Sequence, residues 1–204
     1  MVAGLVGAAW ILPKERPTDA IASVSPIPTG RSDATHELQQ QLDAARGELD
    51  IAKAQLQRAN TVMTYSSRYK IGADLAGVIY DVALAEGIDP ELGFRLVNVE
   101  SEFNDHAVSP VGAIGLTQLM PATAQYFKKG VTRQGLFDRK TNLRIGFRYL
   151  HGLITEYKGD LTMALLVYNR GPATVASLQA QGIDPHNGYS RLVTKGYTGR
   201  GLID

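Results

Sequence analysis

Apolar residues recur at alternating steps of four and three along residues 38–63, with polar residues between them. This spacing is a heptad repeat, which places a continuous apolar seam on one face of a helix. The pattern predicts a long amphipathic helix over residues 33–66. The seam positions are Leu38, Leu42, Ala45, Leu49, Ala52, Leu56, Ala59 and Met63.

The partner of this seam stays open at this point. Residues 38–63 could pair with another chain as a short coiled coil, or could lie against the downstream part of their own chain. Alanine at three of the eight positions weakens any dimer, so the pattern favours neither arrangement.

Residues 67–204 carry helical periodicity almost throughout, which predicts a mainly α domain. Proline at the first position of a helix and glycine just after its last residue mark where the predicted helices begin and end. The stretch 108–118 contains two glycines and several β-branched residues, and it predicts a small β-turn or hairpin. The expected helices are one closed by Gly87, one opened by Pro90, and others over Pro121–Gly130, Asn142–Tyr157 and Leu161–Asn169.

Residues 1–32 precede the long helix and form a third region. Their apolar run, residues 1–12, is shorter than the roughly 20 residues that span a bilayer, and no Lys or Arg precedes it. We interpret it as a weakened or truncated export signal or anchor, with a frayed apolar terminus as the alternative. A proline-rich linker follows, so we expect regions 1–32, 33–66 and 67–204.

Composition and charge exclude several classes of function. A net charge of +1 provides no electrostatic footprint for nucleic acid, and the absence of cysteine rules out thiol nucleophiles and disulfide scaffolds. Phosphate-binding glycine loops are absent, and the four histidines lack metal-ligand spacing. We therefore predict no cofactor and no metal. The histidines are His36, His106, His151 and His186.

Glu100 stands out in the helix opened by Pro90. It shares a face with Leu92 and Leu96, at steps of four, and so belongs to the stripe that faces a core. Burial raises the pKa of a carboxyl group, which suits a general acid. Glu102, by contrast, falls on the polar face. The alternative for Glu100 is a buried structural carboxylate paired with a base or with the backbone.

The segment after Glu100 has the form E-S-x-F, A-x-S and G-A-x-G-L-x-Q-x-M-P-x-T-A over residues 100–124. Further blocks lie at residues 136–150 and 157–172. Together they resemble the lytic transglycosylases that cleave bacterial peptidoglycan, in the goose-lysozyme-like branch of the lysozyme superfamily. The resemblance covers about residues 70–195, and it implies a lysozyme-like helical catalytic domain.

Position by position, the resemblance makes Glu100 the single catalytic acid and places a tyrosine beside it. We expect the Tyr168 hydroxyl to hold Glu100, with a core tyrosine bonded to the backbone as the alternative. Relatives carry a Glu-Thr pair before a tyrosine in the last helix, and residues 184–189 lack that glutamate. The remaining groove residues implied are Ser109, Gln118, Met120 and Asn169, whereas Asp138, Asn142, Tyr149 and Leu150 are assigned to the fold.

The implied activity cleaves the bond between N-acetylmuramic acid and N-acetylglucosamine in peptidoglycan glycan strands. Conventional glycosidases need two carboxylates, and Asp105 is the nearest second candidate, although no pattern buries it. A single acid suits attack by the sugar's own C6 hydroxyl, which forms a 1,6-anhydro ring. The alternatives are a muramidase of the same fold and a non-catalytic peptidoglycan-binding or assembly module. The resemblance implies a protein of the cell envelope or periplasm, exported or membrane-associated, whose seam at residues 38–63 could self-associate or bind an envelope partner.

Overall fold

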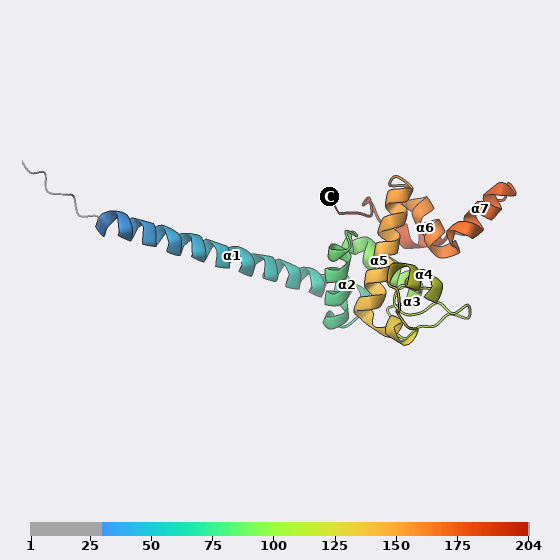
Figure 1. The fold of residues 1–204 in the computed structure, drawn as a ribbon, viewed down its shortest axis with the longest axis horizontal. Helices are drawn as coiled ribbons and strands as arrows, with labels where there is room; N and C mark the ends of the chain where they lie inside the picture. The colour runs from blue at the N-terminus through green and yellow to red at the C-terminus, as the bar shows by residue number, and fades with distance from the viewer. Residues whose placement is uncertain (1–29, 204) are drawn as a thin grey trace, which may run out of the picture. The chain divides into compact units, whose positions relative to one another are not determined.

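The computed structural model describes residues 30–203 of the chain (Figure 1). The predicted export signal or anchor, and most of the proline-rich linker, lie outside these residues. The chain divides into two compact units, residues 1–51 and residues 52–204. The predicted boundary near residue 66 stays a prediction.

Helix α1, Gly30–Tyr69, begins in the first unit and ends in the second. Residues 33–51 are exposed throughout, including the seam leucines Leu38, Leu42 and Leu49. The segment is rich in Ala, Leu, Gln, Glu and Arg, which favour helix without tertiary support. The predicted long amphipathic helix is therefore confirmed, with three more residues at each end.

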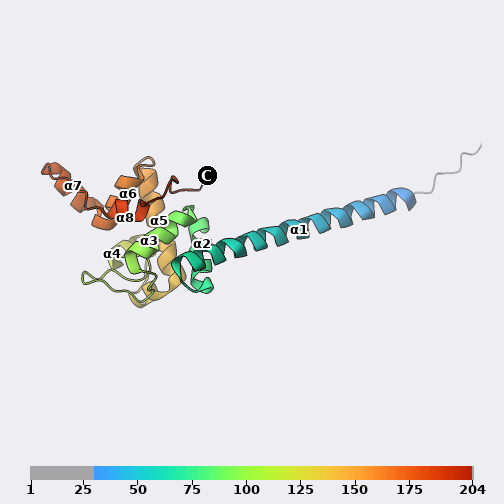
Figure 2. The ribbon, with the colours of Figure 1, turned by 180° about the vertical axis from the view of Figure 1, so that it is seen from behind.

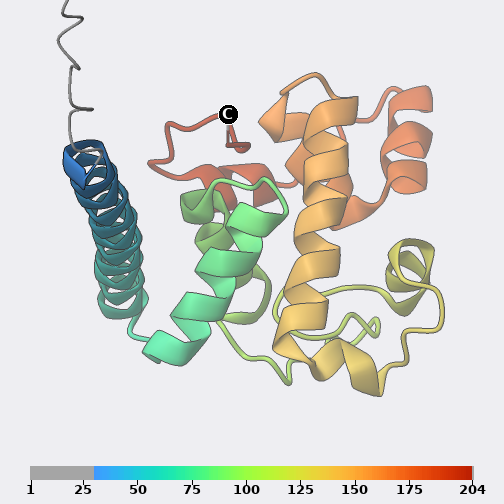
Figure 3. The same cartoon turned by 60° about the vertical axis from the view of Figure 1, so that its left-hand side comes forward.

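The second unit is built around a central helix, α5 (Figure 3). Helices α2, α4 and α6 pack against α5, while α8 lies beside α3 and α6 (Figure 2). The mainly α fold is confirmed. Its elements are α2 Ala73–Ala85, α3 Pro90–Ser101, α4 Pro121–Phe127, the 3-10 helix η1 Gln134–Phe137, α5 Arg139–Glu156, α6 Leu161–Arg170, α7 Pro172–Ala180 and α8 Tyr189–Thr194.

Two apolar cores hold this unit together. The larger core joins α2, α3, α5 and α6 around the buried rings of Phe94 and Phe147. The smaller core lies under the loop that follows α3 and includes Ile114, Leu136 and Ile145. The loop is thus anchored to α5 by apolar packing as well as by hydrogen bonds, which fixes the segment that lines the site described below.

Helices α2 to α6 correspond to the five predicted helices. Helix α5 begins at Arg139, three residues before the predicted Asn142. The preceding residue, Asp138, caps the helix there, because its carboxylate accepts a hydrogen bond from the Thr141 amide. The predicted hairpin is a small β element made of single bridges, Val108 to Ile114 and Ile114 to Leu119. The pattern did not predict η1, α7 or α8, all of which are short.

The end of α1 belongs to the second unit and packs against its other helices through a face that is not the seam. Val62 is buried, and the Tyr65 ring stacks on Phe94 with centroids 4.1 Å apart. Leu56 and Met63 of the seam are more than half exposed. For residues 52–63, the interpretation that the seam lies against its own domain is therefore wrong.

Candidate active site

Glu100 lies in the last turn of α3. Asp89 caps the first turn by accepting a hydrogen bond from the Glu91 amide, and Pro90 occupies the first helical position. The helix ends as Glu102 adopts a left-handed conformation with φ 50°. Leu92 and Leu96 are fully buried, so the stripe predicted from the sequence does direct Glu100 inward.

Glu100 opens into a pocket of about 350 Å³. All six predicted site residues line it, although they come from α3, from the loop before α4 and from the end of α6. Their roles in binding and catalysis stay predictions. The lining comprises Glu100, Ser109, Val111, Ala113, Gln118, Leu119, Met120, Thr123, Tyr149, Tyr168, Asn169, Arg170, Gly171 and Pro172.

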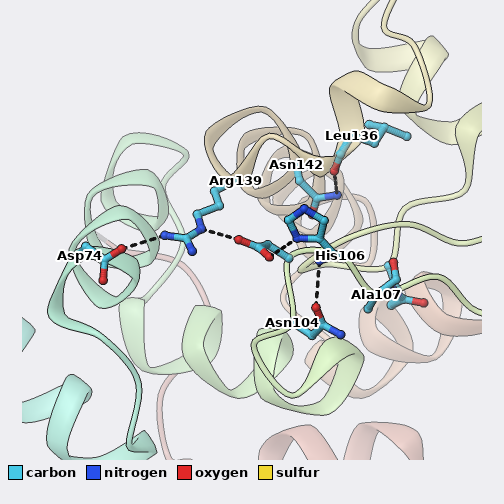
Figure 4. Close-up of polar contacts among 9 residues, drawn as sticks. Asp74, Asn104, His106, Ala107, Leu136, Arg139 and Asn142 are labelled. Atoms are coloured by element: carbon cyan, nitrogen blue, oxygen red, sulfur yellow. Dashed lines mark hydrogen bonds and ion pairs between the residues drawn. The ribbon is translucent and has the colours of Figure 1, made fainter.

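The loop before α4 is held in shape by a buried asparagine of α5. The Asn142 amide nitrogen donates to the carbonyl of Leu136 (Figure 4) and to that of Ile114. The Asn142 side-chain oxygen accepts from the Thr117 amide and hydroxyl. Asn142 is 1% exposed, so leaving these groups unpaired would be costly. Its predicted assignment to the fold is confirmed.

Two further contacts shape the loop. Gly115 has φ +75°, and a Cβ there would lie 2.4 Å from the Asn142 amide nitrogen, so only glycine fits. The Gln118 side-chain nitrogen donates to the carbonyls of Gly115 and Ala107, at 3.0 and 3.3 Å. Both hydrogens of the Gln118 side-chain amide therefore bond main-chain carbonyls of the loop. The side-chain oxygen is still able to accept a hydrogen bond from a ligand.

The electrostatics of Glu100 match those of a general acid. Burial raises the pKa of its carboxyl from 4.5 to about 7, against a hydrogen bond from Tyr189 that lowers it. The Tyr189 hydroxyl donates that bond to Glu100 Oε1, and the ring itself is 6% exposed. Near neutral pH the carboxyl is thus poised between its protonated and charged forms.

The tyrosine that holds Glu100 is Tyr189 of α8, not Tyr168. The Tyr168 hydroxyl donates instead to the main-chain carbonyl of Thr117 at 2.9 Å, so the expectation that it holds the glutamate is wrong. A buried hydroxyl needs an acceptor, and the site loop offers a main-chain one. Burial and the nearby Glu100 carboxyl together raise the pKa of Tyr168 well above its ordinary value.

Sequence reasoning also missed Tyr149 as part of the pocket. The residue was assigned to the fold, yet its ring lines the pocket and stacks on Tyr168 with centroids 5.2 Å apart. Tyr149 lies one helical turn before the buried Leu153, and this spacing is typical of a core residue. The sequence pattern therefore gives no sign that Tyr149 lines the pocket.

Asp105 does not serve as a second acid of the pocket. Its carboxylate bonds Arg139 Nε at 2.6 Å and His106 Nδ1 at 2.5 Å, and Arg139 continues to Asp74 (Figure 4). The Arg139 guanidinium holds the pKa of Asp105 below its usual range, so this group stays charged. Among the described residues, Glu100 is the single carboxyl group that lines the pocket.

Within residues 30–203, no cluster of three or more His, Cys, Asp or Glu side chains has the arrangement of a metal site. In the same part of the chain, no helix combines the length and apolar character that membrane crossing requires.

Residues 78–185 match the family model described as the transglycosylase SLT domain. The soluble lytic murein transglycosylase of Escherichia coli is 38% identical over 94 residues, which cover 43% of this chain and 15% of that protein. The membrane-bound lytic murein transglycosylase C of Haemophilus ducreyi is 35% identical over 181 residues, covering 78% of this chain and 46% of that protein.

Among solved structures, the 70 kDa soluble lytic transglycosylase of Escherichia coli is similar, with a TM-score of 0.51 and 27% identity. The alignment covers 63% of this chain and 24% of that one. The predicted lysozyme-like helical fold is therefore confirmed. The chain spans less than half the length of each of these relatives.

Proposed function

Because the chain belongs to the transglycosylase SLT domain family, we propose that it is a lytic transglycosylase of peptidoglycan. Its substrate is the bond between N-acetylmuramic acid and N-acetylglucosamine in glycan strands. The observation that carries this proposal is the single carboxyl of the pocket, Glu100, whose pKa burial raises to about 7.

In the first step, protonated Glu100 donates its proton to the glycosidic oxygen while the bond from that oxygen to the muramic acid C1 breaks. The 2-acetamido carbonyl of the sugar stabilises the anomeric centre. The Glu100 carboxylate then removes the proton from the sugar's C6 hydroxyl, whose oxygen bonds to C1. The product is a 1,6-anhydro sugar, Glu100 is protonated again, and no water is consumed.

Groups in and behind the pocket position these atoms. Tyr189 donates a hydrogen bond to the carboxylate that exists between the two steps. The Gln118 side-chain oxygen suits a sugar amide N–H, since its nitrogen is committed to the loop. Holding the C6 hydroxyl close to C1 makes the attack intramolecular, which contributes up to about 7–11 kcal/mol in ideal cases.

A direct test compares the wild type with Glu100→Gln on purified peptidoglycan sacculi. We expect the wild type to release soluble fragments and the variant to lose activity by at least a thousandfold, because glutamine cannot donate a proton. Retention of activity in the variant would exclude Glu100 as the acid. No activity in the wild type would favour a non-catalytic binding module.

We further propose that the protein acts at the cell envelope, where its substrate lies. Relatives named membrane-bound lytic murein transglycosylase C support this location. We also propose that the seam at residues 38–63 binds a second copy of the chain. The exposure of Leu42, Leu49 and Leu56 supports this, because pairing of two chains buries such an apolar seam.

A further inference from the structure

Positive charge is concentrated in one stretch of the second unit. Residues 121–151 contain seven Lys and Arg residues and a single Asp, a net charge of +6 in a chain whose total is +1. Such an uneven distribution creates a local field that attracts anions. The stretch comprises α4, η1 and most of α5.

Ion pairs neutralise only part of this charge. Arg139 is bonded to Asp74 and Asp105, while Arg144 and Arg148 share Glu86 at 3.4 and 2.9 Å. A cavity of about 180 Å³ between α4 and α5 brings these two arginines together with Lys128 and Lys140. Four exposed cations and one carboxylate line it, namely Lys128, Lys140, Arg144, Arg148 and Asp138.

This cavity continues along α5. A second cavity, lined by Glu86 after the end of α2 and by His151, shares Phe127 and Arg148 with the first. The two form an elongated hollow, which we call the basic groove. Its shape suits an extended chain that carries several negative charges.

The basic groove adjoins the active-site pocket. The Phe127 ring, which lines the groove, contacts the Tyr149 ring of the pocket with centroids 5.6 Å apart. Helix α4 contributes Thr123 to the pocket and Phe127 to the groove, one turn apart. A peptide attached to a sugar bound in the pocket is long on this scale, since four extended residues span roughly 14 Å.

We propose that the basic groove binds the carboxylates of the short peptides attached to the muramic acid residues of the substrate. This inference rests on the proposed function. The peptides are the anionic part of the polymer, and Lys and Arg side chains recognise carboxylates through charge-assisted hydrogen bonds. The groove thus selects peptide-bearing strands over bare glycan.

The test uses two soluble substrates, glycan strands with their peptides and strands from which an amidase has removed them. The variant is Lys128→Gln with Lys140→Gln, which removes two exposed charges. We expect the ratio of KM on peptide-bearing strands to KM on bare strands to rise about threefold to tenfold. The rise should vanish near 1 M salt, where screening is effective over about 3 Å.

The matched control is Lys195→Gln with Arg200→Gln, which removes two exposed cations outside the groove. We expect this control to leave the KM ratio unchanged. An unchanged ratio in the groove variant would overturn the proposal. The proposal would also be overturned if the groove variant lost binding to phosphatidylglycerol vesicles while its KM ratio stayed at the wild-type value. That result would mean that the basic groove binds a lipid surface and not the peptides.

The proposed function fails separately from this inference. If the wild type cleaves neither substrate, the binding constants for the two strands still test the basic groove. Tighter binding of peptide-bearing strands by the wild type, weakened in the groove variant, would support the inference. Equal binding of both strands would overturn it.

Discussion

Glu100 combines a charge-bearing side chain with a buried position, and this combination has a measurable cost in stability. Its pKa is about 7 in the fold against 4.5 for a solvated glutamate. The charged form therefore destabilises the folded state. The cost is absent well below pH 4.5, grows between pH 4.5 and 7, and is complete above pH 7, where it reaches at most about 3 kcal/mol.

We accordingly predict that Glu100→Gln raises the melting temperature at pH 8 by several degrees and that this gain shrinks toward pH 4. A calorimetric pH series of both proteins measures the difference. The control is Glu102→Gln, an exposed position two residues away, which shows what the loss of one carboxyl at the end of α3 does without burial. A gain for Glu100→Gln that is independent of pH would contradict the raised pKa.

Tyr189 is the residue that tunes Glu100. Its hydrogen bond lowers the pKa of the carboxyl, so Tyr189→Phe should raise that pKa above 7. The first step needs the protonated acid, so the alkaline limb of kcat/KM should move to higher pH. The rate should also fall by about tenfold to a hundredfold, because the intermediate carboxylate loses a charge-assisted bond.

Tyr168→Phe provides the comparison, since the Tyr168 hydroxyl bonds the Thr117 carbonyl and not Glu100. We expect its alkaline limb to stay close to that of the wild type. If the limb moves with Tyr168→Phe and stays fixed with Tyr189→Phe, the roles of the two tyrosines are reversed. The sequence could not separate them, because the pairing of Glu100 with Tyr189 joins residues 89 positions apart through the packing of α8 on α3.

Among the secondary-structure elements, helices with a long apolar stripe and with proline or glycine at their ends were predictable from the sequence. Pro90, Pro121 and the Gly171-Pro172 pair mark real ends because their backbone preferences act locally. Helix α7 carries a single buried residue, Val175, and α8 is six residues long, so neither has a stripe to detect. Their places are set by tertiary packing.

The end of α1 is an element whose role emerged only from the structure. Its heptad pattern predicts the seam, but the residues that pack into the core are Tyr65 and Tyr69, which lie outside the seam. Their rings form an aromatic cluster with Phe94 and Phe103. We predict that Tyr65→Ala lowers the free energy of unfolding by about 2 kcal/mol, because a half-buried ring is lost. Tyr65→Phe, which keeps the ring, should lie within about 0.5 kcal/mol of the wild type.

Urea denaturation of the three proteins measures these differences. A Tyr65→Ala variant as stable as the wild type would mean that the Tyr65 ring contributes nothing to the core of the second unit.

For the whole molecule, the proposed pairing of two chains through the seam can be tested directly. We predict that the full chain self-associates in a concentration-dependent manner and that Leu49→Glu, which places a charge in the middle of the seam, makes it monomeric. Sedimentation velocity over a range of concentrations measures this. The control is Ile51→Glu, an exposed apolar position outside the seam, which should associate like the wild type. A wild type that stays monomeric at every concentration would contradict the second-copy proposal.

The reaction products report directly on the fate of the bond that we propose Glu100 cleaves. Wild-type protein is incubated with peptidoglycan in water enriched in heavy oxygen, and the fragments are weighed by mass spectrometry. We expect 1,6-anhydromuramic ends, lighter than the hydrolysis product by one water and free of the heavy isotope. Reducing muramic ends that carry heavy oxygen would show that water attacks C1, and would identify the protein as a hydrolase.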